Sequence, residues 1–432
     1  MKISVEGYKS IAEKRTVNFS NLTILSGANS SGKSSFMQPL LLIKQTLEND
    51  FDAGSLMLDG SNVKLTDSSE IVSKVSGVDK KNFSISLSNK DYEIKASYKF
   101  RSRRGMHIDN VYHKSADFKD GITISHGLSQ TEAEKLLPPE QVALFKDSFS
   151  KNGKVHWKVE RDRCFLAIKM HLNNQRSPFQ FGFDPSRKLG ILATRLIHVP
   201  GLRGNPERSY KVAVSDNLYP GSFERYVASI VHQWECNSRH KIKFQLLKDQ
   251  LKELGLASSV STKNINETRL ELKISRFAGC NQHPSDYVNI ADVGFGVSQT
   301  LPVLVALLAA KKDQYVYIEQ PELHLHPKAQ FGLAKIIASA VTERNVNVVI
   351  ETHSSILIRG IQILVAKTKL RPEAVSLNWF TQDNENGQTN INEASLDKYG
   401  AFGDWPSDFD DVILNVEQMY LDAVEEAISN EI

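Results

Sequence analysis

The stretch Gly27-Ala28-Asn29-Ser30-Ser31-Gly32-Lys33-Ser34 matches the pattern G-x-x-x-x-G-K-[ST] at every position. In such a loop the glycines let the backbone turn so that successive N–H groups point at one phosphate group. The lysine reaches the outer phosphates, and the serine hydroxyl can bind Mg²⁺. An apolar strand pattern over residues 22–25 precedes the loop and a helical pattern over residues 33–47 follows it, as a phosphate-binding loop requires.

This context favours a phosphate cradle over the alternative, a glycine turn with a surface lysine. The helix after the loop directs its positive end at the same place. The sequence therefore predicts a nucleotide site that is formed by Gly27, Asn29, Ser30, Ser31, Gly32, Lys33, Ser34 and Ser35.

A second apolar strand pattern, residues 315–318, ends at Glu319. A phosphate-binding loop needs a carboxylate near its serine to hold Mg²⁺, usually at the end of an adjacent apolar strand. We therefore expect Ser34 and Glu319 to hold the metal. A helix over residues 327–341 and a strand over residues 346–350 follow, so this region is expected to form a strand–helix–strand unit with parallel strands.

The segment Glu319-Gln-Pro-Glu-Leu-His-Leu-His-Pro327 resembles the Walker B and D-loop segment of ABC-type ATPases of the SMC, RecF and OLD-nuclease group. Thr352-His353-Ser354 is similar to their switch histidine, which contacts the γ-phosphate. The segment 289–299 resembles a divergent form of their signature motif, in which Gly296 or Ser298 would donate to the nucleotide. The resemblance covers residues 1 to about 60 and 190 to 432.

The resemblance implies an α/β fold: a P-loop NTPase of the ABC-ATPase type with a mixed central sheet, flanking helices, a helical lobe and a strand-rich insertion. The insertion is also indicated by polar, alternating segments between Phe83 and about Phe183. We expect residues 1–66 to form the first part of the ATP-binding core and residues 67–189 the insertion. Residues 190–290 would form the helical lobe, and residues 291–432 the second part of the core with a C-terminal extension.

In this group, two heads dimerise head to tail with ATP between them, and the P-loop of one head faces the signature motif of the other. The resemblance thus implies ATP and Mg²⁺ as cofactors and a homodimer or larger homo-oligomer. The start of a helix near Ser298 would present free N–H groups to the partner's nucleotide. A glycine-rich entry into a core helix is the alternative for this segment.

Gln320 stands where the group usually has a glutamate that polarises the attacking water. An amide can orient a water, but it cannot take a proton at neutral pH. Glu322 could substitute if the backbone turns it inward. We therefore expect slow ATP hydrolysis, with catalytic roles at Glu319, Gln320, Glu322 and His353.

Two further segments, 200–210 and 400–409, resemble marks of a bacterial subgroup whose members include ATPase subunits of anti-phage defence, as in Septu-like and PARIS-like systems. The leading hypothesis is accordingly an ATPase switch that controls a partner effector, a nuclease encoded nearby; no Toprim nuclease module is expected in this chain. The alternatives are a RecF-like or SMC-like DNA-repair ATPase that binds or clamps DNA, and a scaffold that binds ATP with little hydrolysis.

Composition restricts the class of protein and the compartment in which we expect it. A net charge of +3 is too small to imply a nucleic-acid or membrane surface. Three widely spaced cysteines exclude a disulfide framework or a four-thiolate zinc site. The most apolar window, residues 301–310, is far shorter than the roughly 20 residues that span a bilayer. We expect a soluble cytoplasmic protein with no membrane partner.

Weaker features have two interpretations each. For His324 and His326, a D-loop at a dimer contact is favoured over a metal site. Arg203 and Arg208 would either reach a partner's phosphate or pack against the core strand. A basic cluster would either meet DNA phosphates or form a solvated face: Lys99, Arg101, Arg103 and Arg104. A C-terminal acidic group would either bind a cation or form an acidic surface: Asp404, Asp408, Asp410 and Asp411.

Overall fold

The computed structural model describes the chain apart from residues 76, 78–79, 103–104, 138–141, 144–154, 173–181, 214–217, 276–285, 404–417 and 420–432. Several residues of the sequence predictions lie outside this described part: Arg103, Arg104, Asp404, Asp408, Asp410, Asp411 and most of the extension segment that begins at Gly400.

A mixed sheet of six strands forms the centre of the molecule, in the order β11-β16-β17-β3-β18-β19. Its first five strands run parallel, and β19 is antiparallel to β18. The strands are β3 (Leu22–Gly27), β11 (Ile197–Val199), β16 (Tyr315–Glu319), β17 (Asn347–Glu351), β18 (Val375–Gln382) and β19 (Thr389–Ala394). Side chains of a strand alternate between the two faces, so Ile24 packs in one hydrophobic cluster and Leu25 in the other.

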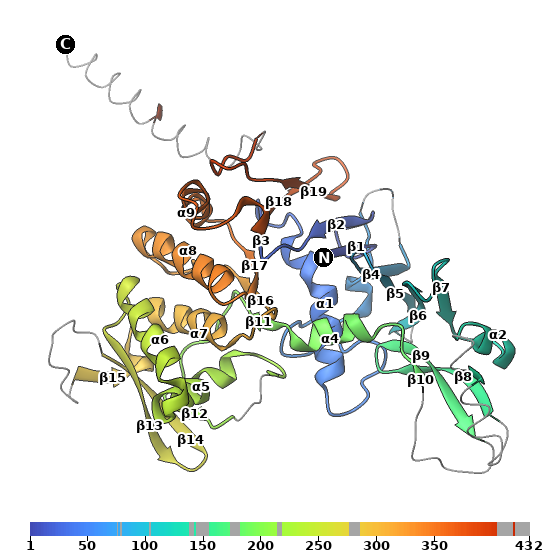
Figure 1. Cartoon of the computed structure of the whole chain (residues 1–432), viewed down its shortest axis with the longest axis horizontal. Helices are drawn as coiled ribbons and strands as arrows, with labels where there is room; N and C mark the ends of the chain where they lie inside the picture. The colour runs from blue at the N-terminus through green and yellow to red at the C-terminus, as the bar shows by residue number, and fades with distance from the viewer. Residues whose placement is uncertain are drawn as a thin grey trace.

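Helices cover both faces of this sheet (Figure 1). One face carries α7 (Phe295–Ala309), α8 (Pro327–Thr342) and α9 (Ser355–Ala366), whose buried residues join Ile24 in the larger cluster. The other face carries α1 (Lys33–Glu48) and α4 (Arg187–Arg195), which pack with Leu25. A strand that is buried on both faces reads as a nearly continuous apolar run, which is the pattern of residues 316–318 and, apart from Thr23, of residues 22–25. The predicted strand–helix–strand unit with parallel strands is confirmed.

A second sheet, entirely antiparallel, has the order β2-β1-β4-β5-β6-β7. Its strands are β1 (Lys2–Glu6), β2 (Arg15–Asn18), β4 (Asn82–Ser88), β5 (Glu93–Arg101), β6 (Gly105–Lys114) and β7 (Ile122–Ser125). A three-stranded sheet lies beyond it, with β8 (Val155–Asp162), β9 (Phe165–Leu172) and β10 (Gly182–Phe183), next to the short helix α2 (Gln130–Lys135). The strand-rich segment is therefore continuous with the N-terminal strands, because β4 pairs directly with β1.

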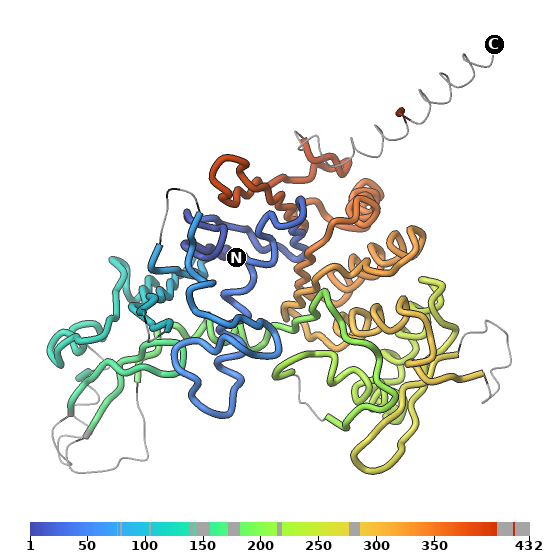
Figure 2. The backbone as a smooth tube through the Cα atoms, turned by 180° about the vertical axis from the view of Figure 1, so that it is seen from behind, coloured from blue at the N-terminus to red at the C-terminus, as the bar shows by residue number. Residues whose placement is uncertain are grey.

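A lobe at the opposite end of the molecule contains α5 (Glu224–Cys236) and α6 (Lys241–Glu253), as the tube in Figure 2 shows. It also holds a small antiparallel sheet of β12 (Tyr210–Lys211), β13 (Ser259–Asn266), β14 (Arg269–Ser275) and β15 (Tyr287–Asn289). The predicted helical lobe is present, and it carries a sheet that was not predicted. Alternate residues of β14, such as Leu272 and Ile274, are buried against the helices of the lobe.

One predicted boundary is wrong. We expected the signature helix to start near Ser298, but α7 begins at Phe295, after an N-cap at Gly294. Four short 3₁₀ segments complete the described structure: Ser68–Glu70, Ser238–His240, Ile290–Asp292 and Pro372–Ala374. Within the described residues, no helix combines the length and the apolar character that crossing a bilayer demands.

Lys243 on α6 provides a test of the lobe's packing. Burial and the neighbouring cations Arg344 and Lys311 lower the pKa of Lys243 to about 8. The charged form is therefore disfavoured in the folded state, and stability rises with pH between about 8 and the ordinary lysine pKa of about 10.4. We expect Lys243→Met to raise the Tm by roughly 2 °C at pH 7 and to have no effect at pH 10.5. Thermal unfolding at both pH values measures this, and an equal gain at both would exclude the charge as its cause.

Candidate nucleotide-binding site

The loop between β3 and α1 has the backbone shape of a phosphate cradle. Gly27, Ser30 and Gly32 have φ values of 140°, 62° and 99°, so the chain reverses repeatedly within a few residues. Gly32 is the N-cap of α1 and offers no side-chain cap, which leaves the first N–H groups of a 16-residue helix available for an anion. The hydroxyl of Thr389 on β19 donates 2.9 Å to the carbonyl oxygen of Ser31 and so fixes the loop from the side.

Lys33 lies folded back onto this loop. Its ammonium group donates to the carbonyl oxygens of Gly27 and Ala28 at 3.1 and 2.7 Å, and the side chain of Lys33 is 4% exposed. Burial lowers the pKa of Lys33, and the nearby Glu351 carboxylate opposes that shift. The ammonium group also donates to the hydroxyl of Ser31 at 3.4 Å. A buried ammonium that is held only by such neutral oxygens can exchange them for the oxygens of a polyphosphate, which bind it more strongly.

The hydroxyl of Ser34 donates a hydrogen bond of 2.8 Å to Glu351, the last residue of β17. The hydroxyl of Tyr317 donates 2.9 Å to the second oxygen of the same carboxylate. Burial and the neighbouring Glu319 raise the pKa of Glu351. The sequence predicted no role for Glu351, only for the Thr-His-Ser segment that follows it. The position of Glu351 at the end of an apolar strand was the signal that could have identified it.

Glu319 ends β16, which is not the neighbour of the loop strand, because β17 lies between β16 and β3. The expectation that Glu319 follows the adjacent strand is therefore wrong, although the register places it beside Glu351. Its two oxygens meet the ring of His198 at 3.1 Å and the backbone N–H of Gly201 at 3.0 Å. Burial opposes ionisation of Glu319, but these hydrogen bonds hold its pKa below the ordinary value.

An open cavity of about 730 Å³ lies against the loop and gathers most of the residues predicted to be catalytic. Its lining residues are Ala28, Asn29, Gln320, Glu322, Leu323 and His353. The structure thus brings Gln320, Glu322 and His353 to the same opening as the loop at residues 27–34.

Within this cavity, Gln320 has a positive φ of 44° and donates its backbone N–H to the carbonyl oxygen of Glu351 at 2.7 Å. One oxygen of Glu322 accepts from Thr352 at 2.6 Å and from the backbone of His353 at 3.1 Å. Burial raises the pKa of Glu322, and its other oxygen is buried without a partner among the described residues. Burial, with Lys33 nearby, lowers the pKa of His353, which favours the neutral ring.

These residues fit a magnesium-bound nucleotide. An uncapped helix start and a buried lysine suit phosphate oxygens. A hydroxyl with two neighbouring carboxylates supplies the oxygen ligands that Mg²⁺ prefers, and Mg²⁺ usually takes only one or two carboxylates besides phosphates and waters. The unpaired oxygen of Glu322 would gain a partner from a water or a hydroxyl in the same cavity.

Comparison with known families agrees with this geometry. A family model described as an AAA ATPase domain matches residues 1–175 and 222–358, well over half of the chain. This chain belongs to the AAA ATPase domain family. No curated protein matches the sequence significantly.

Solved structures that match this AAA-type ATPase include heads of SMC proteins. An SMC head bound to the C-winged helix domain of ScpA has 13% identity and a TM-score of 0.46, covering 92% of this chain and 98% of its own. The SMC head domain from Thermotoga maritima has 11% identity and a TM-score of 0.39, covering 90% and 97%. An Smc head with an extended coiled coil, bound to the C-terminal domain of ScpA derived from Pyrococcus furiosus, has 11% identity and a TM-score of 0.46, covering 91% and 96%.

The first turn of α7 in this ATPase places the two signature candidates differently. Gly296 is half-buried, whereas Ser298 is buried and its hydroxyl donates 3.1 Å to the carbonyl oxygen of Phe295. The exposed side of the turn belongs to Gly294 and Phe295, and the ring of Phe295 packs at 5.7 Å against His324. His326 instead caps α8 through a 3.3 Å bond from the N–H of Lys328.

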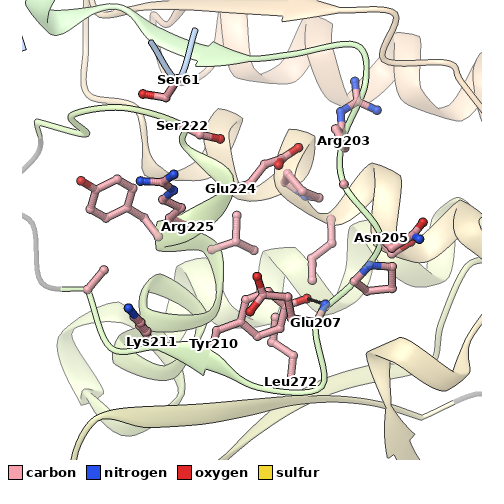
Figure 3. Close-up of a pocket in the computed structure, with 18 of the residues that line it drawn as sticks. Ser61, Arg203, Asn205, Glu207, Tyr210, Lys211, Ser222, Glu224, Arg225 and Leu272 are labelled. Atoms are coloured by element: carbon pink, nitrogen blue, oxygen red, sulfur yellow. Dashed lines mark hydrogen bonds between the residues drawn. The ribbon is translucent and has the colours of Figure 1, made fainter. Parts of the chain in front are cut away.

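Arg203 packs against the core strand, the second of its two predicted interpretations. It is 7% exposed and donates 2.7 Å to the carbonyl oxygen of Glu319 and 3.0 Å to that of Gln299. Burial lowers its pKa to about 10. Arg203 also lines a larger cavity of about 1040 Å³ between the lobe and the core (Figure 3). Arg208 instead forms an exposed ion pair of 2.7 Å with Asp292.

Proposed function

We propose that this ATPase hydrolyses ATP slowly and acts as a nucleotide-dependent dimeric switch that controls a partner effector. The observation that carries the proposal is the open cavity in which the phosphate loop, Gln320 and His353 meet. A site that is open on one side suits a nucleotide that a second molecule covers.

The proposed roles follow from the chemistry of each group. Lys33 and the N–H groups of residues 27–35 bind the phosphates, and Ser34 with Glu319 hold Mg²⁺, which would neutralise charge on the β- and γ-phosphates. The neutral ring of His353 contacts the γ-phosphate. Gln320 orients the attacking water through its amide but cannot accept the proton, and Glu322, whose pKa is raised, is the nearby group that can. Slow turnover follows, because the residue that orients the water is not the residue that accepts its proton.

The covering molecule is a second copy of the same chain. Leu323 at the cavity and His324 next to it belong to one loop, and His324 touches Phe295 at the start of α7. Phe295 is 51% exposed, so its apolar ring is available to a molecule that faces this surface. A partner head that faces this surface would meet the free N–H groups of α7 and the nucleotide together, which supports a head-to-tail arrangement.

We expect the full chain to double its mass in light scattering when Mg²⁺ and ATP are added, and to return to one copy after ADP replaces ATP. Phe295→Asp should prevent the doubling, because it places a charge in the contact, while ATP still binds to the single copy. A wild-type chain that stays monomeric at saturating ATP, or a dimer that forms equally without nucleotide, would contradict the switch.

The effector that we propose is a nuclease encoded nearby, acting in anti-phage defence. The resemblance of residues 200–210 and 400–409 to such systems supports this part of the proposal. Cells that carry the locus should resist phage with the wild-type chain and become sensitive with Lys33→Ala. Protection that survives Lys33→Ala would remove the defence role, and ATP turnover that DNA stimulates would favour the DNA-repair alternative instead.

A further inference from the structure

The hydroxyl of Ser34 has a single proton, and the structure shows where that proton goes. Ser34 donates it to Oε1 of Glu351 at 2.8 Å. The lone pairs of the serine oxygen are then left free, which is the state in which a hydroxyl can bind a cation. A metal-binding group whose proton is held by an outer acceptor is better oriented and more basic than one that turns freely.

Glu351 is itself fixed on every side. It is 5% exposed, and its second oxygen accepts the hydroxyl of Tyr317 at 2.9 Å. Tyr317 is fully buried and its ring stacks on His198 at 5.2 Å between centroids, with 10° between the ring planes. His198 in turn contacts Glu319 at 3.1 Å. A chain of contacts thus joins the Ser34 hydroxyl to the carboxylate that was predicted to hold the metal.

The cost of this arrangement argues for a function. Glu351 and Glu319 lie side by side at the ends of adjacent parallel strands, and two carboxylates in a buried setting repel each other. An apolar residue at the end of β17 would avoid that repulsion and extend the buried run Val348, Val349 and Ile350. A divalent cation beside Ser34 would offset the charge of both groups.

We propose that Glu351 is a positioning residue for the metal ion of this site: it holds the proton of the Ser34 hydroxyl so that the serine oxygen faces the cation. This inference rests on the proposed binding of magnesium-bound ATP. It assigns Glu351 a role that acts through Ser34, whereas Glu319 acts from the neighbouring strand.

The test compares affinities of the full chain for the nonhydrolysable analogue AMP-PNP with Mg²⁺ and with EDTA, measured by calorimetry. Glu351→Met keeps the volume of the side chain but removes the acceptor. We expect it to reduce the ratio of the dissociation constant in EDTA to the dissociation constant in Mg²⁺ by about tenfold, mostly through weaker binding in Mg²⁺. Glu351→Gln keeps an acceptor oxygen and should restore part of the ratio.

Glu235→Met is the matched control. Glu235 on α5 is likewise a carboxylate that accepts from hydroxyl groups, those of Ser261 at 2.6 Å and Thr262 at 2.5 Å, but it is only half-buried and lies in the lobe. This variant should leave the ratio unchanged. If Glu351→Met does not fold, Glu351→Gln combined with Ser34→Ala decides, because a residue that acts through Ser34 adds no loss once the hydroxyl is gone.

The outcomes separate this inference from the proposed function. A wild-type chain that binds no AMP-PNP in either buffer overturns the proposed function. A wild-type chain that binds, together with a Glu351→Met variant that keeps the wild-type ratio, overturns only the role of Glu351. Full additivity of the Ser34→Ala and Glu351→Gln losses would do the same.

Discussion

Lys33→Ala is expected to lower ATP turnover by at least about 10²–10³-fold, the usual cost of removing one preorganised group that stabilises developing charge. Lys33 is the buried cation of the phosphate loop, and its ammonium group lies within 3.1 Å of the Gly27 and Ala28 carbonyl oxygens. Alanine leaves the loop without a charge that reaches the outer phosphates, while the backbone N–H groups remain.

A phosphate-release assay measures this loss, with Lys335→Ala as the control. Lys335 lies on α8, where it forms a largely exposed pair of 3.6 Å with Glu253. This variant removes the same charge away from the loop and should keep wild-type turnover, because exposed ion pairs contribute little. Turnover that survives Lys33→Ala would show that the phosphate is released by another site or by a contaminant.

Gln320→Glu is expected to have the second largest effect, in the opposite direction. The substitution changes an amide, which can only orient water, into a carboxylate that can also take its proton. A positioned general base contributes typically about 10²–10⁴-fold, so turnover should rise by about 10²-fold or more. Gln320 lines the cavity beside the phosphate loop and has its backbone fixed by Glu351, so the new carboxylate enters a held position.

The double variant Gln320→Glu with Lys33→Ala is the control, since an acceleration that belongs to this cavity must disappear with Lys33. No acceleration in the single variant would mean that Glu322 is already an efficient base, so that a second carboxylate adds nothing, and it would contradict the explanation of slow turnover by Gln320. Glu322→Gln would then be the variant that loses turnover.

The fold was predictable where local chemistry decides it. The glycine loop, the apolar runs of β3, β16 and β17 and the proline start of α8 each point to one structure, and all five are found. The start of α7 was placed three residues too late, because Gly294 and Gly296 suggested a loop, whereas Gly294 serves as the N-cap. The sheet added to the lobe was missed because β12 and β15 are very short and because β13, with the sequence SVSTKNIN, is polar at most positions.

The residues of the site were predictable as a set, but their contacts were not. The order of strands in a sheet is a property of the tertiary fold, and a sequence does not state that β17 lies between β16 and β3. For that reason Glu319 was assigned to Ser34, although the hydrogen bond of Ser34 goes to Glu351. Likewise, the partners of Glu319 come from residues 198–201, about 120 positions earlier in the chain, which no local pattern connects to it.

Calorimetry of the purified chain with ATP and Mg²⁺ tests the central claim most directly, that the loop at residues 27–34 binds a polyphosphate. We predict saturable binding by the wild-type chain with one ATP per chain, and loss of that binding in Lys33→Ala. The absence of binding by a folded wild-type chain, or equal binding by both proteins, would contradict the account.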